Sequence, residues 1–270
     1  MKTILCLFLS LLTLNSFAVE VDLKKANLPN NRVITVTGHP DYPPVIWATK
    51  DKKNLQGLSV DLIKLIFKEI NVTVVFKNVE TWGRAQEEVK NGRIDMLLPP
   101  YKTQERLLLY NYSANPFMMD ETAVFVKKGK QFNFLNFSDL TAFKGTAIIN
   151  DSFGSDFDKY DLNNTNITRL ATTDQCFRFV EKDRASFVIA GASAGMAALA
   201  KLNLEDKFVM LPKRIISTGL YAPLSLKSPW NTPEINTYLR KKFQQYNSDG
   251  TVTKLEKKYI NLIKLENKRP

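Results

Sequence analysis

Cysteine and histidine are nearly missing from this sequence of 270 residues, which holds two cysteines and one histidine. Cys6 lies in an apolar N-terminal segment, so Cys176 has no partner cysteine in the rest of the chain, and a disulfide framework is excluded. A lone thiol such as Cys176 is more often a small buried hydrophobic side chain than a nucleophile. With His39 as the one histidine, the usual metal ligands are scarce, and we expect no metal and no cofactor.

Long hydrophobic runs are also lacking. The N-terminus combines Lys2, a short apolar run over Ile4–Leu14 and a polar end at Asn15–Ala18 with small residues one and three places before a cut. This layout predicts a signal peptide over residues 1–18. The alternative is a membrane anchor, but the run is too short to cross about 30 Å of hydrocarbon. No later stretch approaches the roughly 18 apolar residues of a spanning helix.

A long basic block is missing although the formal net charge is +11. The lysines are spread along the chain in pairs such as Lys127–Lys128 and Lys257–Lys258, and no nucleic-acid-binding motif accompanies them. We therefore expect no nucleic-acid partner. The charge indicates a solvated surface with a mild preference for anionic partners.

Two series of alternating strands and helices follow the N-terminal segment. The first comprises strands at 32–37, 72–76 and 94–98 with helices at 57–70 and 83–90. In its first helix Ser59 is the expected N-cap, and Leu65 belongs to the expected buried face. The second series comprises strands at 123–126, 147–149, 167–170, 187–190 and 208–211 with helices from 173 and over 192–200. Two helices, 233–246 and 252–262, end the chain. Two successive open α/β units predict two lobes with a ligand crevice between them.

Several motifs occur in an order that resembles the bacterial extracellular solute-binding proteins, family 3. They are Gly57–Leu62, Trp82 with Val89–Asp95, Thr103–Arg106 with Tyr112, Ser113 and Pro116, Phe143–Gly145 with Ser152–Gly154, and Ser248–Thr251 with Lys258–Tyr259. The resemblance implies an α/β, two-lobed fold of the type II periplasmic-binding class with a hinge and an interlobe crevice. Lobe 1 would comprise 19–125 and 219–270, lobe 2 would comprise 126–218, and the hinge would lie near 124–130 and 215–222.

The resemblance also implies roles for individual residues. Arg106 stands where the family holds a ligand carboxylate, and its planar fork of donors suits that group; the alternative is a solvated arginine. Tyr42 and Trp82 stand where the family places aromatic walls, although a lone tryptophan is often core packing. Free N–H groups and a hydroxyl at the turn of the second lobe can receive an anion. The expected ligand-binding residues are thus Tyr42, Trp82, Tyr101, Arg106, Ser152, Phe153 and Gly154.

The sequence departs from the family pattern in two places. Leu98–Tyr101 replaces the hydroxyl residues that usually meet the ligand there. Gly191–Gly195, after a predicted strand, carries no carboxylate, although a buried ligand ammonium needs a counter-charge or several acceptors. The ligand can therefore be an amino acid or an organic anion without an amino group.

The resemblance implies a monomeric periplasmic protein that delivers a small carboxylate-bearing ligand to the permease of an ABC importer. A sensor or partner-binding module on the same fold is the first alternative. A dehydratase-type enzyme is less favoured, because the sequence shows no paired carboxylates at crevice positions and His39 is interpreted as a loop residue. We therefore expect no enzymatic activity.

Overall fold

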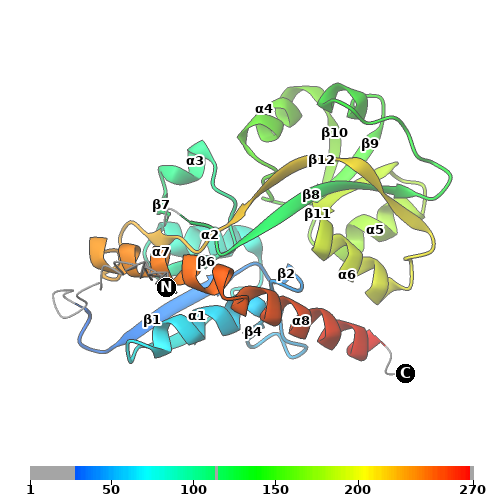
Figure 1. Ribbon diagram of the computed structural model, residues 1–270. Coiled ribbons are helices and arrows are strands. Elements are labelled where there is room, and N and C mark those ends of the chain that lie inside the picture. Colours follow the sequence, from blue (N-terminus) through cyan, green and yellow to red (C-terminus); the bar gives the residue numbers. More distant parts are fainter. Residues whose placement is uncertain (1–27, 113–114, 268–270) are drawn as a thin grey trace, which may run out of the picture.

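The computed structural model describes residues 28–112 and 115–267, so the predicted signal peptide lies outside the described residues. Within these two ranges, no helix has the length and apolar character needed to cross a membrane. Figure 1 shows two lobes joined by two long strands, β8 (Met118–Lys127) and β12 (Phe208–Leu220).

Lobe 1 contains a sheet of five strands in the order β5-β1-β6-β13-β7. The central strand β1 (Val33–Gly38) pairs in parallel with β5 (Thr73–Phe76) and β6 (Met96–Leu98), and β13 (Leu224–Ser225) is antiparallel to β6 and to β7 (Tyr110–Asn111). A smaller antiparallel sheet joins β2 (Asp41–Tyr42), β3 (Ile46–Ala48) and β4 (Leu55–Gln56). The helices of this lobe are α1 (Leu58–Lys68), α2 (Trp82–Lys90), α3 (Gln104–Leu107), α7 (Pro233–Ser248) and α8 (Thr251–Asn267).

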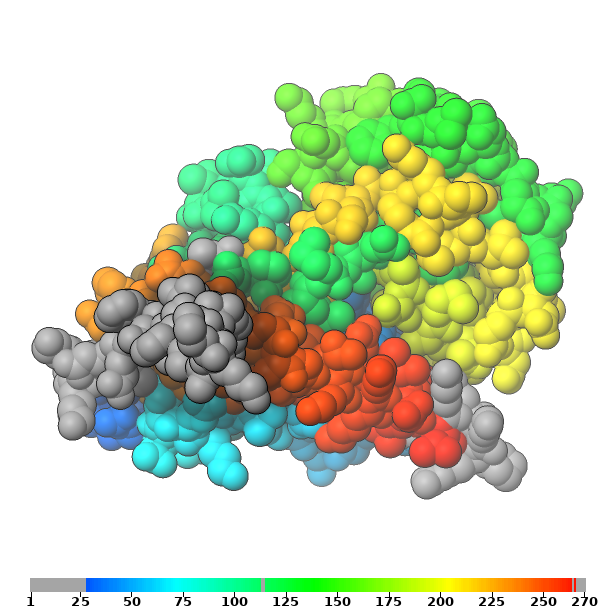
Figure 2. All heavy atoms as spheres, in the orientation of Figure 1, coloured from blue at the N-terminus to red at the C-terminus, as the bar shows by residue number. Residues whose placement is uncertain are grey.

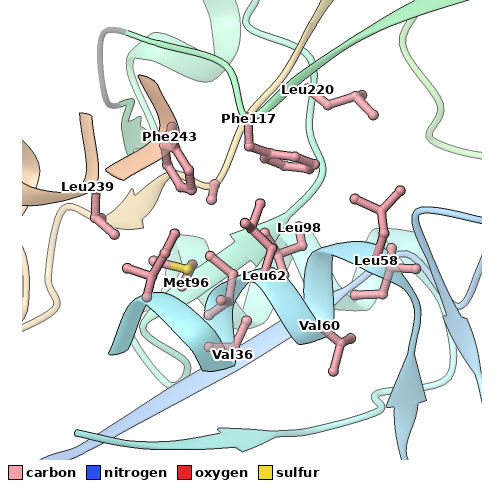
Figure 3. Close-up of a cluster of buried hydrophobic side chains, with 14 of the residues drawn as sticks. Val36, Leu58, Val60, Leu62, Met96, Leu98, Phe117, Leu220, Leu239 and Phe243 are labelled. Carbon is pink, nitrogen blue, oxygen red and sulfur yellow. The ribbon is translucent and has the colours of Figure 1, made fainter. Parts of the chain in front are cut away.

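The core of lobe 1 lies between α1, the sheet and α7. Figure 3 shows side chains from these elements converging with Phe117 and Leu220, which lie at the lobe 1 ends of β8 and β12. Each large apolar side chain buried in this way contributes about 1.5–3 kcal/mol. Because Phe117 and Leu220 are fully buried, both connecting strands are anchored firmly in lobe 1.

Lobe 2 contains a sheet in the order β10-β9-β11-β8-β12. Strands β9 (Lys144–Ile148), β10 (Asn166–Leu170) and β11 (Phe187–Gly191) are parallel, whereas β8 is antiparallel to β11 and β12. The helical segments are η1 (Phe137–Leu140), α4 (Ser155–Asn164), α5 (Thr173–Glu181) and α6 (Ala192–Leu202). Strands β8 and β12 stay paired from Lys127 to Met118, with register shifts near Arg214. They extend across the predicted lobe limits, which remain a proposal.

The predicted strands and helices occur in the predicted order, but α3, α4 and several short strands were not predicted, and two details of the first helix were wrong. Gly57 occupies the N-cap of α1, and Ser59 lies in the first turn, where its hydroxyl donates to the carbonyl of Val45 at 2.9 Å. Leu65 is 41% exposed. Gly57 has φ +134°, and a Cβ there would lie 2.4 Å from the Val45 carbonyl oxygen, so this turn requires glycine.

Cys176 lies on the buried face of α5, as predicted for a small hydrophobic side chain, and burial raises the pKa of its thiol to about 12. At pH 8 the thiolate fraction is then about a thousandth of that of a free cysteine. We expect a disulfide reagent to label Cys176 at least a thousandfold more slowly in the folded protein than in guanidinium, measured spectroscopically in a Cys6→Ser variant. Similar rates in both states would contradict this burial.

Candidate functional site

A small cavity of about 20 Å³, partly open to solvent, lies between the two lobes. Its lining residues come from both lobes: His39, Tyr42, Trp82, Pro99, Pro100, Tyr101, Arg106, Asp151, Ser152, Phe153 and Gly191. The structure thus brings together six of the seven residues expected to bind ligand. Gly154 is not in the lining. It is the N-cap of α4, with φ +93°, one residue beyond Phe153.

The lobes contact each other across this cavity, so the structure represents a closed arrangement. The Thr173 N–H, at the start of α5, donates to the Asp41 carboxylate at 2.8 Å. The Gln86 side-chain amide donates to the Asn150 carbonyl at 3.3 Å. Further from the cavity, α8 of lobe 1 lies against α6 of lobe 2 (Figure 2).

Arg106 lies on the short helix α3, whose N-terminus is capped by the Thr103 hydroxyl. Its guanidinium donates to the Tyr101 carbonyl at 3.3 Å and to the Gln86 side-chain oxygen at 3.1 Å. The residue is 7% exposed, and no carboxylate of the described chain lies within 4.0 Å of the guanidinium. A buried cation with neutral partners alone retains donors for an anion.

The aromatic wall of the cavity consists of Trp82, at the start of α2, and the ring of His39. The two ring centroids are 5.1 Å apart, and the Arg106 guanidinium lies 5.7 Å from the Trp82 ring. His39 lies in the loop between β1 and β2, as interpreted from the sequence, but it is also 3% exposed and lines the cavity, which the sequence did not indicate. Its Nδ1 accepts from the Asp41 N–H at 3.0 Å. In the neutral ring, Nε2 therefore carries the proton, and it lies 3.3 Å from the Asp151 carboxylate.

A buried network of hydroxyls and one carboxylate lies beside the cavity. The hydroxyls of Tyr42 and Tyr101 both donate to the same oxygen of Asp120, the latter at 2.8 Å. The two phenol oxygens are 3.1 Å apart, and the Thr122 hydroxyl lies 3.0 Å from that of Tyr101. Burial raises the pKa of Asp120 and, together with the charge of Asp120, that of both tyrosines.

The turn of lobe 2 is occupied by a side chain of its own. Both the Ser152 hydroxyl and the Phe153 N–H donate to the carboxylate of Asp158, the N–H at 2.7 Å. Burial raises the pKa of Asp158. An anion at this turn would have to displace Asp158, so the expected anion-receiving role of Ser152 and Phe153 stays a prediction.

The sequence showed no paired carboxylates at crevice positions, but two single carboxylates there were missed. Asp151 lines the cavity, and Asp120 lies directly behind Tyr42 and Tyr101. Asp120 comes from β8, whose first half was missed because the sequence Met118–Thr122 is polar. Along this strand Asp120 and Thr122 are buried and Glu121 is exposed, but because all three residues are polar the sequence carries no signal of this alternation. No group of three potential metal-ligating side chains occurs within 28–112 or 115–267.

Comparison with known proteins identifies the family. The family model of the bacterial extracellular solute-binding proteins, family 3, matches residues 34–262. A search of the curated proteins found no significant match.

Three solved structures share the fold. A mutant of ArgBP from T. maritima is 17% identical, with 85% of this chain and 95% of that chain covered and a TM-score of 0.69. A putative binding component of an ABC transporter from Wolinella succinogenes, complexed with lysine, is 19% identical, with 84% and 94% covered and a TM-score of 0.71. A histidine kinase sensor domain is 18% identical, with 84% and 96% covered and a TM-score of 0.70. The predicted two-lobed fold is confirmed, and the chain belongs to the bacterial extracellular solute-binding proteins, family 3.

Proposed function

We propose that this protein captures a small solute bearing a carboxylate between its two lobes. Arg106 carries the proposal, because it is a buried cation beside the interlobe cavity with no carboxylate of the described chain within 4.0 Å. A ligand carboxylate supplies the missing counter-charge, and bidentate pairing with the guanidinium fixes its orientation. Trp82 and His39 lie beside this anchor, and Tyr42, whose ring centroid is 5.5 Å from that of His39, and Tyr101 line the same cavity.

The cavity of the closed arrangement is small, with about 20 Å³ of free space, which is room for little more than a water molecule. A ligand therefore has to enter while the lobes are further apart than they are here. Residues from both lobes line the cavity, so a ligand that contacts both sides stabilises the closed arrangement over an open one. Capture by closure of the lobes is the mechanical consequence, with β8 and β12 as the connecting strands.

The proposed cellular role is delivery of the ligand to the permease of an ABC importer from the periplasm, with residues 1–18 as the export signal. Membership of an extracellular binding-protein family supports the location, and the similar Wolinella succinogenes protein is described as an ABC transporter component. A sensory role is the second candidate, since a histidine kinase sensor domain has the same fold. Loss of ligand uptake in cells lacking the gene would support transport; unchanged uptake with a lost transcriptional response would support sensing.

A thermal-shift screen tests the proposed ligand class. We expect at least one carboxylate from a panel of amino acids and organic acids to raise the melting temperature by about 5–10 °C at a hundredfold excess over its dissociation constant. The matched control is the primary amide of the same compound, which cannot pair with Arg106 as an anion. Equal shifts by acid and amide, or no shift with any acid, would contradict the proposal. Turnover of a bound compound would instead identify an enzyme.

A further inference from the structure

We propose that Asp120, acting through the hydroxyls of Tyr42 and Tyr101, provides the recognition site for a cationic N–H group on the ligand. The inference rests on the proposed function, because the cationic group belongs to the same molecule whose carboxylate meets Arg106. It makes Asp120 a specificity-determining residue that does not itself line the cavity.

The position of Asp120 supports this role. Tyr42, Tyr101 and Gly191 line the cavity, and Asp120 contacts the hydroxyls of both tyrosines from behind. A Cβ on Gly191 would lie 3.1 Å from the Asp120 carboxylate, so the acid is one atomic layer from the cavity surface. Asp120 is 7% exposed, and no basic side chain of the described chain lies within 4.0 Å of its carboxylate.

The proton count of the hydroxyls indicates what they can accept. Each phenol has a single proton, and both protons are directed to one oxygen of Asp120. The two phenol oxygens, 3.1 Å apart, then have no proton between them. An N–H donor from the cavity relieves this contact, and the carboxylate behind polarises both oxygens toward it.

The other acids of the crevice have different surroundings. Asp158 accepts from the Ser152 hydroxyl and the Phe153 N–H, and Asp151 lies 3.3 Å from Nε2 of His39, which makes no hydrogen bond to it. Asp120 differs from both, because its side-chain donors are hydroxyls that face the cavity. The buried cation Arg106 and the buried anion Asp120 therefore bound one cavity, and together they complement a ligand that carries both charges.

Calorimetry with matched ligands tests the inference. Each standard amino acid is paired with its des-amino acid, for example L-phenylalanine with 3-phenylpropanoate and L-glutamate with glutarate. In the pair that binds best, we expect the amino acid to bind ten- to a hundredfold more tightly than its des-amino acid. This is the range for hydrogen bonds to a charged group. Its N,N,N-trimethyl derivative, which keeps the positive charge without N–H donors, should lose this advantage.

The variant Asp120→Asn should weaken binding of the amino acid alone. The ratio of the two dissociation constants, des-amino acid over amino acid, should then fall to about twofold or less. Glu121→Gln is the matched control, because Glu121 lies next on the same strand, is half-exposed and pairs with Arg214 at 2.7 Å. It should leave the ratio unchanged. Tyr42→Phe and Tyr101→Phe each remove one acceptor and should lower the ratio in the same direction, which keeps the test valid if Asp120→Asn does not fold.

The outcomes separate this inference from the proposed function. Equal binding of both members by the native protein overturns the role of Asp120 and leaves the carboxylate anchor standing. An unchanged ratio in the Asp120 and tyrosine variants, or an equal loss for both members, also overturns it. If neither member of any pair binds, the carboxylate anchor fails and the inference fails with it.

Discussion

Replacing Arg106 with alanine should weaken binding of the carboxylate ligand by roughly 30- to 4000-fold. This range corresponds to about 2–5 kcal/mol, the usual cost of removing one partner of a buried, hydrogen-bonded charge pair. The loss is large because the ligand carboxylate would be desolvated in a closed cavity without a counter-charge. Titration calorimetry of the native protein and the variant, with the tightest-binding carboxylate from the thermal-shift screen, measures the difference.

The fold should survive this change. The Tyr101 carbonyl, which accepts from Arg106, also accepts from the Tyr112 hydroxyl at 3.0 Å, so it keeps a partner. Arg106→Lys retains the charge without the planar fork and should give an intermediate affinity. Arg93→Ala is the matched control, because Arg93 is 57% exposed and is paired with Glu88 on the surface. Native affinity in the Arg106→Ala variant would refute the carboxylate anchor.

The sequence was informative wherever the signal is local. Period-2 and period-3.6 patterns predicted the main strands and helices of both lobes, since these elements bury apolar faces in the core of their own lobe. The short helix α3 and the weakly amphipathic α4 escaped this reasoning. In α4 only Phe157 is fully buried, so its sequence shows no apolar stripe.

The site was harder to predict because its contacts join distant positions. Tyr42 and Asp120 are 78 residues apart, and Tyr101 and Asp120 are 19 apart, so no spacing rule connects them. Asp120 is the clearest case: its position before an apolar run suggests a loop, and pairing of β8 with β12 and β11 turns that segment into a strand. The Ser152 hydroxyl reaches Asp158 because of the turn between them, and the sequence does not reveal the geometry of that turn.

The closed arrangement depends on the missing side chain of Gly191, and its replacement by alanine should block closure. A Cβ at this position would lie 2.2 Å from the hydroxyl oxygen of Tyr42 in the other lobe and 2.8 Å from its ring. The backbone itself does not require glycine, because Gly191 has φ −54° and ψ 136°, which any L-residue can adopt. The clash therefore belongs to the closed arrangement and not to the fold of lobe 2.

We expect Gly191→Ala to lower ligand affinity by roughly 5- to 150-fold, since overpacking a well-packed contact costs about 1–3 kcal/mol. Gly191→Val should lower it further. Small-angle scattering should show that ligand reduces the radius of gyration of the native protein but not of the variant. Gly57→Ala is the informative contrast: there φ is +134° and the neighbour is backbone of the same lobe, so thermal stability should fall with or without ligand. A Gly191→Ala protein that closes and binds like the native protein would show that Tyr42 moves aside, and the contact between Tyr42 and Gly191 would then not limit closure.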